Sequence, residues 1–168
     1  DGVCATCLEP LTAAVALYCG DFLAGFTLSD CPEFDDWQFF QAEGLRRDLA
    51  AVLAKLVHLH CQRSEYEAAI TCARRWLALD PPHEPVHREL MQLYALAGQP
   101  AAAFRQYQEC QRLLDEELGV EPEAATTVLL EAIRTRRFLP VEQGRGRETE
   151  TGQALQGPAT RERTPAIF

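Results

Sequence analysis

Apolar side chains recur along the chain with the spacing of buried helix faces. The first stripe comprises Leu45, Leu49, Val52, Leu53 and Leu56. The second stripe comprises Val86, Leu90, Leu93, Tyr94 and Ala97. Spacing of three and four residues is typical of amphipathic helices, and no alternating apolar and polar segment of comparable length predicts a strand. The sequence therefore predicts an all-α fold.

Glycine, proline and a capping pattern mark the expected helix ends. Gly98 is followed by Pro100, and Gly119 is followed by Pro122, which is typical of one helix ending and another beginning. The stretch SEYE at 64–67 has the spacing of a capping box. With these limits, the pattern predicts helices over 9–18, 33–62, 66–79, 84–97, 100–117 and 122–137.

An internal repeat predicts the architecture. A shift of about 34 residues, the period of tetratricopeptide repeats, places Leu56 on Leu90 and superimposes 45–79 on 79–113, each expected to be a helix pair. The positions that resemble the repeat pattern are Ala69, Ala103, Pro81 and an aromatic residue at Tyr66 or Tyr107. We therefore expect a right-handed, tetratricopeptide-like array of antiparallel helix pairs, about six helices in all, whose flanking helices cover its ends.

The chain divides into a predicted domain over 1–140 and a tail over 141–168. After Pro140 the sequence is rich in Gly, Glu, Arg, Thr and Gln and offers little to bury. We expect this tail to be a flexible linker. Because the chain begins at Asp1 rather than Met, we also expect it to be a piece of a longer protein.

The segment YCGDFLAGF at 18–26 is too apolar for a solvated loop and too rich in glycine for a helix. Gly20 and Gly25 allow backbone angles that other residues resist. Its large apolar side chains are Phe22, Leu23 and Phe26. Full burial would stabilise the fold by about 1.5–3 kcal/mol for each such side chain. The segment is therefore predicted to act as a packing wedge.

Charge limits the classes of partner. The formal net charge is −9, and residues 1–60 hold nine Asp or Glu against three Lys or Arg. Such a balance repels phosphate backbones, so no direct binding of nucleic acid is expected.

No membrane span or signal peptide is recognised, and free cysteines inside the helical patterns favour a reducing, cytoplasmic compartment.

The pair Cys4 and Cys7 has the two-residue gap of half a zinc site or of a thiol-redox motif. A structural zinc site needs four ligands, and no second such pair occurs, so zinc would require ligands outside this sequence. His83 and His87 are four residues apart and could share one helix face. A metal- or thiol-responsive sensor using Cys4 and Cys7 therefore stays open beside the expectation of no cofactor.

An acidic and aromatic run, DCPEFDDWQFF, occupies 30–40. Aromatic side chains are frequent in interaction hot spots, and acidic side chains steer basic partners. The candidate interaction surface comprises Asp30, Glu33, Asp35, Asp36 and Trp37. The alternative is a helix start whose acidic residues favour the helix dipole and whose aromatic side chains are buried.

No phosphate-binding loop, nucleophile elbow or zinc-protease motif occurs, so no enzymatic activity and no catalytic residue is predicted.

Over roughly 12–137, the sequence resembles the bacterial transcriptional activator domain. The resemblance rests chiefly on GDFLAGF at 20–26, the acidic and aromatic run after it, and LLDEELGVEP at 113–122. Its signature positions are Gly20, Asp21, Phe22, Leu23, Gly25, Phe26, Ala69, Pro81, Ala103, Tyr107, Gly119 and Pro122.

The resemblance implies a tetratricopeptide-like interaction domain from the middle of a transcriptional regulator. In this family such a domain usually follows a winged-helix DNA-binding domain and often precedes a P-loop ATPase module. The expected partners are therefore neighbouring domains, RNA polymerase or a second protomer. A free-standing tetratricopeptide adaptor unrelated to transcription is the remaining alternative.

Overall fold

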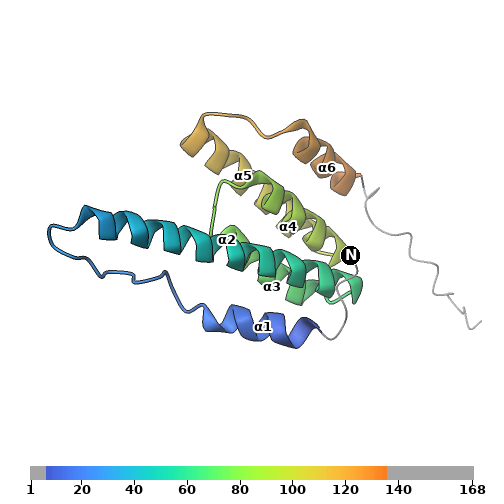
Figure 1. Ribbon diagram of the computed structural model, residues 1–168. Helices are drawn as coiled ribbons and strands as arrows, with labels where there is room; N and C mark the ends of the chain where they lie inside the picture. Colours follow the sequence, from blue (N-terminus) through green and yellow to red (C-terminus); the bar gives the residue numbers. More distant parts are fainter. Residues whose placement is uncertain (1–6, 136–168) are drawn as a thin grey trace, which may run out of the picture.

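The computed structural model describes residues 7–135, which contain six α-helices, one π-helical turn and no strand (Figure 1). The elements are α1 Leu8–Leu17, α2 Pro32–Gln62, α3 Tyr66–Leu77, α4 Glu84–Leu96, α5 Pro100–Leu113, η2 Leu114–Leu118 and α6 Ala124–Arg134. The predicted all-α fold is confirmed, and the α-helix limits differ from the expected ones by a few residues. The proposed tail at 141–168 lies outside the described residues.

Two helical hairpins form the body of the molecule. Helices α2 and α3 form the first hairpin, α4 and α5 form the second, and α3 packs on α4 between them (Figure 1). Helix α3 begins at Tyr66 and α5 at Pro100, which reproduces the repeat shift predicted from the sequence. Helix α1 packs on α2 at one end, and α6 packs on α4 and α5 at the other. The array is therefore tetratricopeptide-like, with one flanking helix at each end.

Both hairpins turn through the same hydrogen-bonded motif. At the end of α2, the N–H of Ser64 bonds to the carbonyl of Cys61 at 2.9 Å, and the N–H of Glu65 bonds to that of His60 at 2.9 Å. After α4, Gly98 occupies the position that Ser64 occupies after α2. The N–H of Gln99 bonds there, at 2.8 Å, to the helix carbonyl that corresponds to that of His60. This is the Schellman pattern of a helix C-terminus. The predicted capping box at Ser64 is wrong, because Ser64 ends α2 instead of capping α3.

Ser64 has a φ of 58° and Gly98 a φ of 73°, both in the left-handed region. A side chain with a Cβ is strained there, whereas glycine is not. We expect Ser64→Gly to raise the free energy of unfolding by about 0.5–1 kcal/mol. The matched change, Gly98→Ser, should lower it by a similar amount, because a Cβ there meets no neighbouring atom and only the backbone is strained. Urea denaturation measures both, and equal stabilities for all three chains would contradict this account.

The core lies in the hairpins and between them. Ala69 and Ala103, at equivalent positions of the two hairpins, are fully buried where paired helices approach, and Leu90 and Met91 of α4 are fully buried in the same cluster. Tyr107 is half-buried against it. A second cluster joins α1 to α2 through the side chains of Val15, Leu49, Leu53 and Leu56.

A buried polar network fastens α6 to the second hairpin, and sequence reasoning missed it. The Glu84 carboxylate accepts hydrogen bonds from Thr126 Oγ1 and from the backbone N–H of Glu123, the latter at 2.8 Å. Arg88 donates to Thr126 Oγ1 at 3.0 Å and to the Glu123 carboxylate at 2.8 Å. Glu84 and Thr126 are buried. The N-terminus of α6 is thus held by specific polar contacts as well as by Leu129 and its apolar neighbours.

Candidate interaction surface

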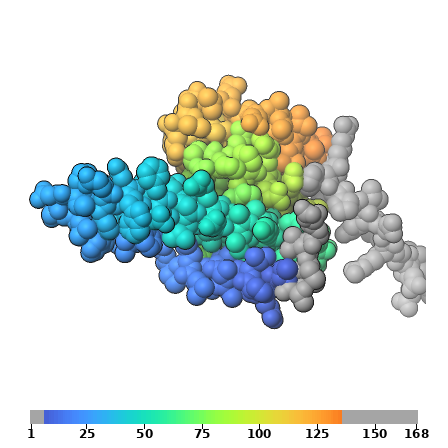
Figure 2. All heavy atoms as spheres, in the orientation of Figure 1, coloured from blue at the N-terminus to red at the C-terminus, as the bar shows by residue number. Residues whose placement is uncertain are grey.

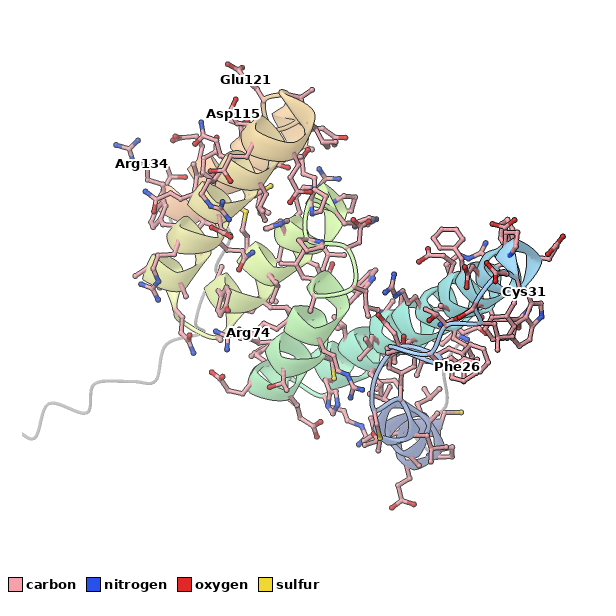
Figure 3. All side chains as sticks on the ribbon, turned by 90° about the vertical axis from the view of Figure 1, so that its left-hand side faces the viewer. Phe26, Cys31, Arg74, Asp115, Glu121 and Arg134 are labelled. Carbon is pink, nitrogen blue, oxygen red and sulfur yellow. The ribbon has the colours of Figure 1, made fainter. Side chains whose placement is uncertain are left out.

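Residues 18–44 form an arm that projects from the helical body (Figures 1 and 2). Helix α2 has 31 residues but its hairpin partner α3 has only 12, so the N-terminal half of α2 extends past the hairpin. Segment 18–31 leaves α1, runs along this half of α2 and then turns into it (Figure 1). Figure 3 places Phe26 and Cys31 on the arm, well away from Asp115, Glu121 and Arg134 on the second hairpin and α6.

Polar contacts hold segment 18–31 against α2. The Arg46 guanidinium binds both carboxylate oxygens of Asp21, one of them through Nε at 3.1 Å. The Tyr18 hydroxyl donates to Asp21 at 3.0 Å, and the Gln38 amide donates to the carbonyl of Leu23 at 2.8 Å. The hydrogen bonds from Arg46 and Tyr18 lower the pKa of Asp21. These contacts therefore persist above the ordinary pKa of an aspartate and weaken only as the pH falls through the lowered value.

The backbone of the segment turns at three left-handed residues. Gly25 has a φ of 79°, Leu23 a φ of 52° and Asp30 a φ of 62°. The expectation for Gly25 is confirmed. Gly20 does not adopt a positive φ, so the special backbone freedom expected of it is not used. The sharp turn arises instead at Leu23, which is fixed by its hydrogen bond from Gln38.

The aromatic side chains of the arm pack on one another but stay open to solvent. Phe22 meets Trp37 edge-on with ring centroids 5.7 Å apart, and Phe26 meets Phe34 in the same way at 5.6 Å. Phe26 and Trp37 are each 47% exposed, and Phe22 is only half-buried. The predicted packing wedge is therefore wrong, because the segment lies on the surface of an arm and fills no groove in the core.

Two further aromatic residues, Phe39 and Phe40, are 60% and 68% exposed. Phe40 lies three residues after Trp37, so helix geometry places it beside that ring. The alternative that the aromatic side chains of this helix start are buried is also wrong. Sequence reasoning did not include Phe39 and Phe40 in the interaction surface, although both belong to the acidic and aromatic run that indicated it.

The acidic residues of the run lie on the same arm as these rings. Glu33 and Asp35 lie in the first turn of α2, where negative charge favours the helix dipole as expected. Asp30, Asp36 and these two residues are all exposed, and within residues 7–135 none of the four forms an ion pair with a basic side chain. Residues 18–44 contain six Asp or Glu and no Lys or Arg. The arm is therefore apolar and uniformly acidic.

A groove runs between segment 18–31 and α2. It has a volume of about 350 Å³, and its walls include Phe22, Phe26 and Phe39. Asp35 also lines it, as do Asp21 and Arg46, which are paired with each other. The groove can thus accept an apolar side chain between aromatic rings, with a carboxylate at its edge.

The candidate metal ligands are Cys4 and Cys7, with His83 and His87 as a second pair. Cys4 lies outside the described residues, and Cys7 immediately precedes α1. His87 is fully buried, where its Nε2–H donates to the carbonyl of Pro81 at 2.8 Å and its Nδ1 accepts from the Gln106 amide at 2.7 Å. Among residues 7–135 no three potential metal-ligating side chains come together.

Cysteine environments differ sharply across the fold. Cys110 is fully buried in α5, and burial, together with the nearby Glu84 carboxylate, raises the pKa of its thiol to about 12. Cys19 is exposed at the base of the arm. Because the thiolate is the reactive form, we expect iodoacetamide to modify Cys19 in the native chain but Cys110 only after unfolding. Peptide mapping by mass spectrometry measures both, and equal native labelling of the two would contradict the packing of α5.

The hairpins, their flanking helices and the projecting arm define the class of the chain: a tetratricopeptide-like helical-repeat domain. A model of the family described as "Bacterial transcriptional activator domain" matches residues 1–134. The chain belongs to this family, as its sequence motifs indicated, and is a transcriptional-activator-type regulatory domain. Comparisons with curated proteins and with solved structures found no match. None of the described helices is long and apolar enough to cross a membrane.

Proposed function

We propose that this domain acts as a non-enzymatic protein-interaction scaffold in a cytoplasmic bacterial transcriptional regulator, and that the arm is its principal contact surface. The chain would be one part of a longer protein. It would couple a DNA-binding domain to other domains or to RNA polymerase, while the DNA contacts would be made by that other domain. No cofactor or catalytic step enters this mechanism.

The proposal is supported chiefly by the exposed apolar surface of the arm. Of the eleven most exposed large apolar side chains among residues 7–135, six lie on the arm: Leu23, Phe26, Leu28, Trp37, Phe39 and Phe40. An apolar patch that projects from a folded body is typical of an interaction site. The body supports this role, because α2 continues into the first hairpin and is anchored there by Leu49, Leu53 and Leu56.

A reporter fusion tests the proposal. The whole chain is fused to a DNA-binding protein that does not activate transcription by itself, and expression of a promoter-linked reporter is measured in bacteria. We expect the fusion to raise reporter expression above that of the DNA-binding protein alone. A well-expressed, folded fusion that leaves expression unchanged would contradict recruitment of the transcription machinery by this domain.

A further inference from the structure

We propose that the arm receives a basic segment of a second protein, with apolar side chains entering the groove between Phe26 and Phe39 and arginine or lysine side chains facing Asp35 and Asp36. This proposal rests on the proposed function and names the chemistry of the partner. The groove supplies the apolar contact, and the charges on the arm select the partner.

The groove favours an apolar side chain flanked by cations. Phe22, Phe26 and Phe39 line it. Burial of a leucine-sized side chain between such rings is favourable, and a guanidinium can also stack on an exposed ring such as that of Phe40. Asp35 at the groove and Asp36 one residue further along α2 then lie within reach of cationic side chains of the same segment.

The charges on the arm are available to a partner. Asp21 and Glu43 are already paired with Arg46, which uses their charge inside the domain. The carboxylates of Asp30, Glu33, Asp35 and Asp36 have no basic partner among residues 7–135. Complementary charge across an interface accelerates association and rejects partners of like charge.

The same charge disfavours the other occupants of the arm. A second copy of this chain carries the same net charge of −9, so pairing two arms would bring unpaired carboxylates together. Nucleic acids and anionic lipid surfaces are negatively charged and are repelled in the same way. A basic protein segment is the partner that satisfies both the aromatic groove and the carboxylates.

The length of the arm sets the size of the segment. Residues 32–44 of α2 span about 20 Å at the rise of an α-helix. A partner helix lying along this length presents three to four turns, that is, about five to seven apolar side chains on one face. A short amphipathic peptide is therefore a sufficient probe.

Three synthetic peptides test the proposal by fluorescence anisotropy with the whole chain. The first has leucine on one helix face and arginine on the other, the second replaces arginine with glutamate, and the third replaces leucine with serine. We expect binding of the first, with a Kd that rises with salt, no binding of the second, and about tenfold or more weaker binding of the third. Equal binding of the first and second peptides, or no binding of the first, would overturn the proposal.

Variants of the chain locate the binding. Replacing both Phe39 and Phe40 with serine should weaken binding of the first peptide by about tenfold or more, while Val128→Ser should not, although Val128 on α6 is 67% exposed. Replacing Asp35 and Asp36 with asparagine should weaken binding and flatten its salt dependence, whereas Glu117→Gln with Glu121→Gln should not. Circular dichroism confirms that each variant is folded. Binding that is insensitive to the arm variants contradicts the proposal.

Three results separate this proposal from the proposed function. Reporter activation that needs Phe39 and Phe40, without binding of the basic peptide, would overturn the partner chemistry but keep the interaction role. Sedimentation that shows self-association, lost on replacing the same two residues with serine, would assign the arm to a second copy and overturn the basic partner. Absence of reporter activation would contradict recruitment of the transcription machinery by this domain, whatever the peptide does.

Discussion

Leu90→Ala is expected to lower the free energy of unfolding by about 2–5 kcal/mol. Leu90 is fully buried on α4 in the core cluster that includes Ala69 of α3 and Ala103 of α5. Its removal leaves a cavity at the junction of the two hairpins, where close packing prevents the helices from collapsing into the space. Urea denaturation followed by circular dichroism measures the change.

Phe26→Ala is the matched comparison, because it removes a larger side chain from an exposed site. Phe26 contacts Phe34 but is 47% exposed, so we expect a loss of about 1–3 kcal/mol from the aromatic pair and the partial burial of the ring. A larger loss for Phe26→Ala than for Leu90→Ala would restore the idea of a packing wedge. It would also contradict the position of the arm outside the core.

Glu84→Ala is expected to lower the free energy of unfolding by about 2–3 kcal/mol, mainly by loosening α6. The change leaves the Thr126 hydroxyl and the N–H of Glu123 without their acceptor, and Arg88 loses one of its two carboxylate neighbours. An unsatisfied buried donor costs more than a hydrogen bond contributes on average. Hydrogen exchange of α6 amides, measured together with urea denaturation, reports the effect.

Two substitutions control for the loss of a carboxylate. Glu84→Gln keeps an oxygen that can accept from Thr126, so it should cost less than Glu84→Ala. Glu131→Ala removes an exposed carboxylate from α6 itself and should change stability little, because exposed ion pairs contribute about 0–1 kcal/mol. Equal effects for Glu84→Ala and Glu131→Ala would show that the buried network does not hold α6.

The helices could be predicted because their apolar spacing is local information. Leu90, Leu93 and Tyr94 mark a buried face by sequence alone, and the shift between the two repeats predicted how the hairpins pair. Ser64 resembles a helix cap in the sequence because a serine before a helix is usually one, and only the tertiary structure shows that it occupies the left-handed position of Gly98. The π-helical turn at Leu114–Leu118 follows α5 directly and has no separate apolar period that would reveal it.

The sequence indicates where the arm lies, but it does not predict that the apolar side chains of the arm are exposed. The acidic and aromatic run at 30–40 was recognised as a candidate surface, yet periodicity shows only that a helix has an apolar face. It does not show whether another element covers that face. At Phe39 and Phe40 none does, because α3 ends before it reaches that half of α2. The long-range contacts of Asp21 with Arg46, and of Glu84 with Thr126, depend on the tertiary fold and left no local signal.

The arm is the proposed contact surface of this transcriptional activator domain. The most direct test compares reporter activation by three fusions: the unchanged chain, the chain with Phe39 and Phe40 replaced by serine, and the chain with Val128→Ser. The account predicts loss of activation only for the arm variant, with all three chains equally folded and equally abundant. Activation that survives in the arm variant but is lost with Val128→Ser would contradict the account and move the contact surface to α6.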